Sequence, residues 1–206
     1  MKYSVRHQTR YLYADQVAIS YNRVHSQPRP QEWQTFSQAR LSIDPEPAFL
    51  AKQTDFFGNP VTFFTVQEPH SELRVTVLFE ANVQARTYSQ EGWSWEELAA
   101  SLAHPASPSS LEVSQFRFAS TWVEVSEPLR RFAAPSFRPG CTVLEGARDL
   151  CRRIHADFVF DPEATTIATP VQEVLDSRRG VCQDFAHLFI GAMRSLGLAA
   201  RYVSGY

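Results

Sequence analysis

Hydrophobic and polar residues alternate along most of the first 86 residues, and turn-forming residues separate the alternating runs. From Tyr3 to Tyr13 the alternation places most of the aromatic side chains on one face, which is the period-2 pattern of a β-strand. The prolines of residues 44–47 end a later run, because proline has no N–H to donate to a neighbouring strand. Short strands separated by such turns predict an antiparallel β-sandwich. The expected strands cover residues 3–13, 17–24, 33–43, 49–55, 61–67 and 73–80.

The composition changes after Tyr88, where the apolar positions predict helices. Residues 93–102 predict a short helix, and the proline- and serine-rich residues 104–110 predict a loop. Thr142 is the expected N-cap of a helix whose apolar residues recur at three- and four-residue steps as far as Ile154. We therefore expect two domains, at residues 1–88 and 89–206.

The last part of the chain predicts a short helix, a long buried helix and a strand. Residues 171–175 predict a helical turn that residues 178–180 break. Residues 182–196 contain no proline and are apolar on nearly every side, and a helix of that kind is buried. Gly197 ends this helix, and residues 199–203 predict a strand. Together with the sandwich, these elements predict an α+β protein.

Composition and charge narrow the class of protein. The 206 residues are 44% hydrophobic and 13% aromatic, which is enough to form a core, and we expect the aromatic residues of the first domain to lie in it. The net charge of −2, without runs of like charge, disfavours nucleic acid as a partner. The charged N-terminus does not resemble a secretion signal, and no stretch approaches the ~18 apolar residues that a membrane helix needs.

The three cysteines, Cys141, Cys151 and Cys182, are odd in number and form no C-x-x-C pair. This disfavours a disulfide framework and a zinc site. The sequence also lacks a glycine-rich phosphate loop, an H-E-x-x-H motif and an acidic metal cluster, so no cofactor is expected. We predict a reduced, cytoplasmic protein in which Cys141 and Cys151 are structural thiols.

Cys182 is the candidate catalytic residue, because it falls in the first turn of the predicted buried helix. The unpaired N–H groups and the positive end of the helix dipole favour thiolate over thiol there. Arg178 and Arg179 could add to this field. A thiolate in this position suits covalent acyl transfer, with the N–H groups holding the developing oxyanion. The alternative for such a cysteine is a small buried hydrophobic residue.

A nucleophilic cysteine generally needs a histidine base, and none of the six histidines is a convincing one. His187 lies five residues after Cys182, so it points roughly 140° away around the helix. We interpret His187 as a packed or hydrogen-bonded residue, and Asp184 as electrostatic support for the helix N-terminus. The remaining histidines have no cue of their own: His7, His25, His70, His104 and His155.

Several motifs in order resemble one family over nearly the whole chain. Residues 179–206, R-G-V-C-Q-D-F-A-H-L-F-I-G-A-M-R-S-L-G-L-A-A-R-Y-V-S-G-Y, resemble the nucleophile segment of the bacterial transglutaminase-like superfamily, whose core is papain-like. The extended segment and short helix at 158–174 resemble those that precede that cysteine. H-Q-T-R-Y-L-Y at 7–13, D-F-F-G-N-P at 55–60 and E-P-H-S-E-L at 68–73 are similar to the family's N-terminal β-sandwich.

The resemblance implies a β-sandwich followed by the helical half of a transglutaminase-like core, with Cys182 attacking an amide of a protein or peptide to form a thioester. Family members transfer the acyl group to an amine or to water. The family histidine, followed by Ala-Trp, and its aspartate, before Pro-Thr, come some tens of residues after the cysteine. This chain ends at Tyr206, before either. We therefore expect a C-terminally truncated fragment that is inactive or nearly so alone.

The missing part would supply strands for the Cys182 helix to pack against, so Phe185, Phe189 and Met193 are expected to face too little protein. We expect this face to be buried by self-association. Two other hypotheses stay open. The chain could be a non-catalytic binding or assembly module derived from the family, or a second polypeptide could supply the histidine and the aspartate.

Overall fold

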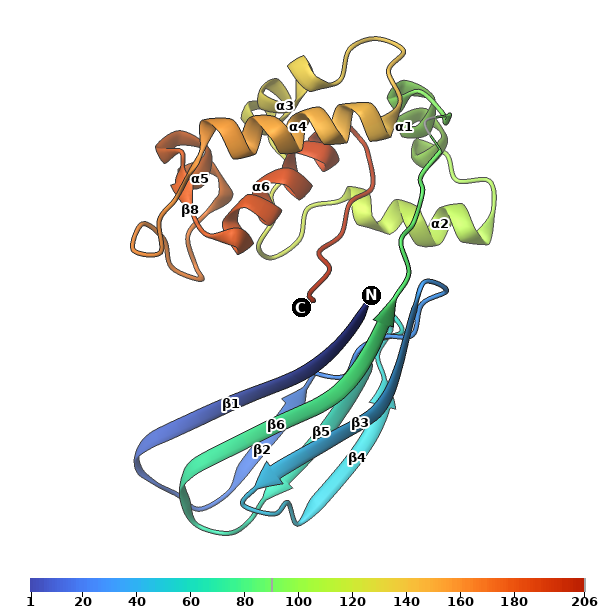
Figure 1. The fold of residues 1–206 in the computed structure, drawn as a ribbon. Helices are drawn as coiled ribbons and strands as arrows, with labels where there is room; N and C mark the ends of the chain where they lie inside the picture. Colours follow the sequence, from blue (N-terminus) through green and yellow to red (C-terminus); the bar gives the residue numbers. More distant parts are fainter. Residues whose placement is uncertain (90, 206) are drawn as a thin grey trace. The chain divides into compact units, whose positions relative to one another are not determined.

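Within residues 1–89, two three-stranded antiparallel sheets stack as a β-sandwich (Figure 1). One sheet has the strand order β1-β6-β3, and the other has the order β2-β5-β4. The antiparallel sandwich predicted from the alternation is therefore confirmed. The strands are β1 (Lys2–Val17), β2 (Ser20–Val24), β3 (Gln34–Asp44), β4 (Phe49–Thr54), β5 (Pro60–Val66) and β6 (His70–Val83).

The computed structural model describes residues 1–89 and 91–205. The chain forms two compact units, Met1–Thr87 and Tyr88–Tyr206, and the first of them contains all of the sandwich. The second unit contains the helices and one short parallel pair of strands.

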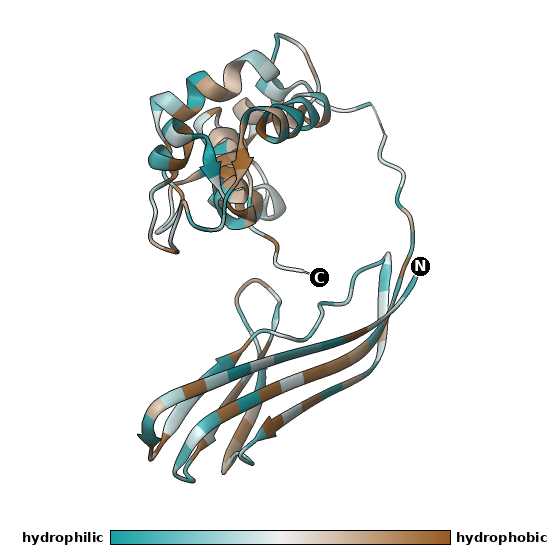
Figure 2. Cartoon of the chain, turned by 60° about the vertical axis from the view of Figure 1, so that its left-hand side comes forward, coloured by the Kyte–Doolittle hydropathy of each residue, from teal (hydrophilic) through white to brown (hydrophobic). Residues whose placement is uncertain are grey.

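The core of the sandwich lies between the inner faces of β5 and β6. Phe64 and Val66 of β5 pack against Leu73 and Val75 of β6, and each of the four is at most 5% exposed. Every second residue of β6 points inward, so the strand appears as alternating bands of hydropathy in Figure 2. Burial of this one face is what holds the two sheets together.

The prediction that the aromatic residues of this unit form its core is wrong for many of them. Phe64 and Phe79 are buried, but Tyr21 and Phe56 are about 80% exposed. Tyr21 lies in β2, where an aromatic residue on the outer face of the sheet is exposed, whereas Phe56 lies in the turn between β4 and β5. The other exposed aromatic residues of the unit include Tyr3, Tyr11, Phe49 and Phe57.

The second unit is built from helices, of which α3, α4 and α5 pack against α6. Among the described residues, no helix is both long enough and apolar enough to cross a membrane. The helices of the second unit are α1 (Trp95–Ala103), α2 (Pro108–Ser114), α3 (Glu127–Ala133), α4 (Val143–Asp157), α5 (Val171–Ser177) and α6 (Cys182–Ser195). Two 3-10 turns, η1 (Gln115–Arg117) and η2 (Ala134–Ser136), and the parallel strands β7 (Val159–Phe160) and β8 (Arg179–Gly180) complete it.

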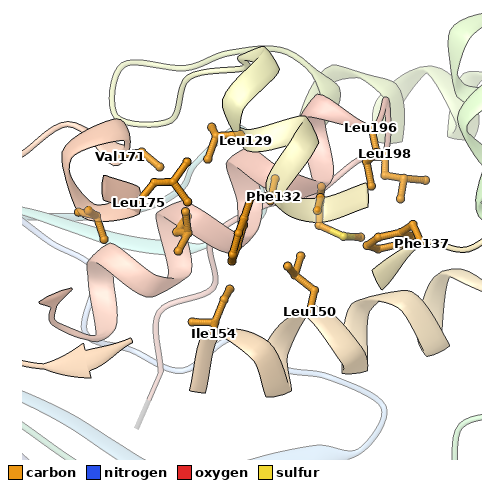
Figure 3. Close-up of a cluster of buried hydrophobic side chains, with 14 of the residues drawn as sticks. Leu129, Phe132, Phe137, Leu150, Ile154, Val171, Leu175, Leu196 and Leu198 are labelled. Carbon is orange, nitrogen blue, oxygen red and sulfur yellow. The ribbon is translucent and has the colours of Figure 1, made fainter. Parts of the chain in front are cut away.

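The core of this unit joins α3, α4, α5 and α6 in one cluster. Leu150 and Ile154 of α4 lie across the cluster from Phe132 of α3, and Leu175 of α5 lies on the side near Leu129 (Figure 3). Leu188 of α6 and the residues around it are buried on most sides. The prediction of a buried helix from residue 182 to residue 196 is therefore confirmed, with its end one residue earlier.

Capping explains where the predicted helices begin. Thr142 is the N-cap of α4, since its hydroxyl accepts from the backbone N–H of Glu145 and the Glu145 carboxylate accepts from the backbone N–H of Thr142. Ser107 caps α2 in a similar way, with Pro108 in the first turn. Residues 108–110 are therefore helical, and the prediction of a loop there was wrong. The helix α3 was not predicted from the sequence.

The prediction of a strand at residues 199–203 was also wrong, because within the described residues no strand pairs with this segment. A strand needs a neighbour for its backbone groups. These groups instead bond elsewhere. The N–H of Ala200 donates to the Phe116 carbonyl, and the Ala200 carbonyl accepts from the guanidinium of Arg194 at 2.8 and 3.0 Å.

Arg194, in the last turn of α6, is 8% exposed, and its guanidinium donates four hydrogen bonds. Besides the two to Ala200, these bonds go to the Phe118 carbonyl and to the Ser120 hydroxyl. Burial lowers the pKa of this guanidinium from its ordinary value. Arg194 thus joins the end of α6 to the segment that follows it, at Ala200, and to a segment more than 70 residues earlier, at Phe118 and Ser120.

We expect Leu150→Ala to destabilise the helical unit by about 2–5 kcal/mol. The Leu150 side chain is fully buried, so its truncation leaves a cavity in the core. The measurement is urea unfolding followed by far-ultraviolet circular dichroism, which reports the helical unit. Leu111→Ala is the matched control, because Leu111 of α2 is 62% exposed, and its effect should stay within about 0.5 kcal/mol. Equal effects of the two substitutions would contradict this description of the core.

Candidate active site

Cys182 is the first residue of α6, and its side chain is exposed. The N-cap residue, Val181, has an extended backbone and no side-chain acceptor with which to cap the helix. Phe185 is the first residue whose N–H bonds within the helix, to the carbonyl of Val181. The N–H groups of Cys182, Gln183 and Asp184 therefore precede the first bond within the helix, and their role in binding an oxyanion stays a prediction.

The turn before Cys182 is held by the short parallel pair of strands. Phe160 of β7 lies opposite Gly180 of β8, and the Gly180 carbonyl accepts from the N–H of Asp161 at 2.9 Å. Arg178, which ends α5, has a left-handed backbone (φ 58°) that turns the chain into β8. These bonds fix the direction in which the chain enters α6.

Asp184 is in the first turn of α6 and is only 5% exposed. Its Oδ2 accepts from the backbone N–H of Val181 at 2.7 Å and from the hydroxyl of Thr165 at 2.6 Å. The sequence predicted electrostatic support of the helix N-terminus by Asp184. The structure adds two specific hydrogen bonds, one of them to a residue 19 positions away.

Arg178 and Arg179 have structural contacts of their own. The Arg178 guanidinium lies 4.7 Å from the ring centroid of Phe158 and 5.2 Å from that of Phe132. Arg179 forms an ion pair with Asp161 at 3.3 Å. Both guanidinium groups therefore have partners other than the thiol. An effect of Arg178 and Arg179 on the Cys182 thiolate stays a prediction.

His187 lies one turn further along α6, partly buried, with its ring edge-on to Tyr202 at a centroid distance of 5.7 Å. Burial lowers the pKa of His187, with a smaller opposing effect of Asp184 and a smaller effect in the same direction from Arg194. The interpretation of His187 as a packed residue agrees with this environment. Among residues 1–89 and 91–205, no hydrogen bond joins a histidine to Cys182.

The other histidines have surroundings of their own. In the sandwich unit, His70 is 5% exposed, and its ring nitrogens contact the Glu68 carbonyl at 2.7 Å and the Ser20 hydroxyl at 3.5 Å. Within the described residues, no histidine is therefore placed as a base beside the candidate nucleophile Cys182.

An apolar cavity of about 440 Å³ lies beside α6. The prediction that Phe185, Phe189 and Met193 lack covering protein is wrong for Met193, which is 5% exposed and belongs to the core. Phe185 and Phe189 are partly buried and line the cavity. The other lining residues are Cys151, Ile154, Ala186, Ile190, Arg201, Tyr202 and Val203.

All three cysteines are free. Cys141 is partly buried, and burial is the main cause that raises the pKa of its thiol. Cys151 is exposed in the middle of α4, a position where helical hydrogen bonds already use the backbone N–H groups. Cys182 thus differs from Cys151 in its place on the helix while sharing its exposure.

Both parts of the chain match known protein families. Residues 3–82 match the family described as bacterial transglutaminase-like N-terminal region, and residues 130–206 match the transglutaminase-like superfamily. An uncharacterized protein of Mycobacterium tuberculosis (strain ATCC 25618 / H37Rv) is 41% identical over 211 residues, which cover all of this chain and 65% of the relative. One of Mycobacterium leprae (strain TN) is 30% identical over 202 residues, which cover 98% of this chain and 70% of the relative.

A solved structure shares the fold. The crystal structure described as a "Putative Cysteine Protease" from Cytophaga hutchinsonii superposes with a TM-score of 0.75 at 18% identity, over 97% of this chain and 65% of that chain. The chain thus spans 65% of the length of both this protein and the M. tuberculosis relative.

We expect iodoacetamide to alkylate Cys182 faster than Cys151, because both thiols are exposed but only Cys182 has a helix N-terminus to stabilise its thiolate. The expected rate ratio is several-fold and at most about 30-fold, which corresponds to the ~2 kcal/mol upper range of helix-end effects. Peptide mapping of the native protein at neutral pH measures both rates.

Cys141 should react slowest, because burial raises the pKa of its thiol. Equal rates at Cys182 and Cys151 would contradict activation by the helix.

Proposed function

Because the chain belongs to the transglutaminase-like superfamily, we propose that it carries the nucleophile of a cysteine enzyme that acts on amide bonds. The observation that supports this most directly is the exposed Cys182 at the start of α6, where the N-cap residue, Val181, has no side-chain acceptor. An exposed thiol at such a position can attack electrophilic groups that arrive from solvent. The neighbouring N–H groups can then hold the negative charge that develops.

The proposed reaction proceeds through a thioester. The Cys182 sulfur attacks the carbonyl carbon of the amide, and the carbonyl oxygen takes up negative charge against the N–H groups of the first turn of α6. When the tetrahedral intermediate collapses, the C–N bond breaks, and the proton that the thiol has lost passes to the leaving amine. An incoming amine or water then attacks the thioester and releases the thiol, so the overall reaction is acyl transfer or hydrolysis without a redox step.

The proposed substrates are amides of proteins or peptides, and the choice between an amine and water as acceptor decides between a transferase and a protease. The chemistry needs no cofactor, since cysteine itself is the nucleophile. Cytoplasmic location stays a prediction.

We propose further that the described residues, without a histidine base from elsewhere, catalyse this reaction slowly. A histidine that takes the thiol proton and later protonates the leaving amine usually contributes about 10² to 10⁴-fold to the rate. No described histidine is placed to do this for Cys182. An activated ester, whose leaving group needs no proton, should therefore acylate Cys182 even where an amide does not react.

We expect p-nitrophenyl acetate to place one acetyl group on Cys182, which intact-mass and peptide mass spectrometry can locate. Peptide amides should show no turnover by the same chain. Cys182→Ser should remove the rapid acetylation, whereas Cys151→Ser, the matched exposed thiol, should leave it unchanged.

Acetylation of Cys151 and Cys182 at the same rate would support a non-catalytic module with an ordinary thiol. Turnover of amides that depends on Cys182 in this chain would overturn the expectation of inactivity.

Self-association through the face that bears Phe185 and Phe189 stays a prediction, supported by the apolar cavity that these residues line. We expect light scattering to show a mass that rises with concentration, and Phe189→Glu to reduce this rise. Phe118→Glu is the control, because Phe118 is 65% exposed and is not among the residues that line the cavity. A concentration-independent monomer that binds no hydrophobic dye would contradict the prediction.

A further inference from the structure

We infer that Asp184 is a positioning residue for Cys182, because it joins the first turn of α6 to the loop that precedes α5 through one buried carboxylate oxygen. The inference rests on the proposed role of Cys182 as a nucleophile. It assigns to Asp184 and Thr165 the task of holding the thiol and the oxyanion-binding N–H groups in one fixed arrangement.

The first step of the argument is the geometry at Asp184. Both of its hydrogen bonds, from Thr165 and from the N–H of Val181, end on Oδ2, at 2.6 and 2.7 Å. Hydrogen bonds to a carboxylate are roughly twice as strong as those between neutral groups. Asp184 is only 5% exposed, so water competes little for these bonds. The Val181 N–H belongs to the residue directly before Cys182, so its bond constrains the backbone of the nucleophile itself.

The second step concerns Gly180, which is buried beneath the carboxylate. A Cβ atom at this position would lie 2.7 Å from Oδ2 and 2.9 Å from the Cβ of Asp184. Both atoms belong to a short side chain held by two bonds, so neither can move aside cheaply. The absence of a side chain at residue 180 is therefore what lets Asp184 reach across the turn to Val181.

The third step concerns the loop at residues 161–170. Its other hydrogen bonds within the described chain are local, as between Thr166 and Thr169, or reach the strand β8 through Asp161. The Thr165 hydroxyl is the group that connects the loop to α6. A change in the position of this loop would therefore act on the turn that presents Cys182.

These three observations distinguish positioning from simple capping. A capping residue bonds only to its own helix terminus, whereas Asp184 also holds a distant segment. Because both donors share one oxygen, an asparagine can place its amide oxygen there and keep both bonds while losing the charge. Alanine loses both bonds. The pair of substitutions therefore separates hydrogen bonding from charge.

The test compares two reactions of Cys182 in a Cys151→Ser background. Alkylation by iodoacetamide requires only an accessible thiolate, whereas acylation by p-nitrophenyl acetate also uses the oxyanion-binding N–H groups. We expect Asp184→Ala to lower the acylation rate by roughly 10 to 10²-fold, the range expected when reacting groups are misplaced by about 1 Å. We expect its effect on alkylation to be clearly smaller.

Asp184→Asn should restore acylation to within about threefold of the parent, since an amide oxygen can accept both bonds. Thr165→Val removes one of the two donors and should give an intermediate loss of acylation, which keeps the test available if Asp184→Ala does not fold. Asp176→Ala is the matched control, because Asp176 is exposed on α5 and, within residues 1–89 and 91–205, its carboxylate accepts a hydrogen bond only from Gln172. Circular dichroism of each variant checks that the helical unit is folded.

A folded Asp184→Ala protein that loses both reactions equally, or loses neither, would overturn the inference. Failure of the proposed function has a different signature. If Cys182 in the parent protein acylates no faster than Cys151, the nucleophile assignment fails whatever the Asp184 variants do.

Discussion

The packing of α6 on nearly all of its sides is the constraint on which the candidate site depends. Leu188 and Ala192 are fully buried among α3, α4 and α5, so the helix cannot rotate or slide without opening the core. A nucleophile at the end of a loosely held helix would have no fixed direction. Here the apolar middle of α6 sets the direction, and the polar contacts at its two ends set the fine position.

Local sequence signals were sufficient for the elements whose own residues determine them. The alternation of β6 reports which side of the strand is buried, and the hydroxyl of Thr142 reports where α4 begins. The same reasoning failed for residues 199–203, whose β-branched and aromatic residues suggest a strand although no partner strand lies beside them. Strand formation depends on a neighbour, and the sequence of one segment does not contain that neighbour.

In the candidate site, too, one part follows from a local sequence pattern and another depends on the tertiary fold. Cys182 could be found from the sequence, because a cysteine at the start of an apolar helix is a local pattern. The bond between Thr165 and Asp184 joins residues 19 positions apart and is set by the tertiary fold. Gly180 was the available signal, since a glycine permits a close approach that a Cβ atom would block. Which group approaches could be learned only from the structure.

The bonds of Arg194 have a mechanical consequence for the nucleophile. The helix α6 is a stiff rod of about 21 Å, with Cys182 at one end and Arg194 in its last turn at the other. Arg194 donates hydrogen bonds to the carbonyls of Ala200 and Phe118, so these bonds hold α6 at the end far from the thiol. A force on the segment around Ala200 would therefore reach α6 through Arg194, and the packed middle of the helix would have to yield before that force could displace Cys182.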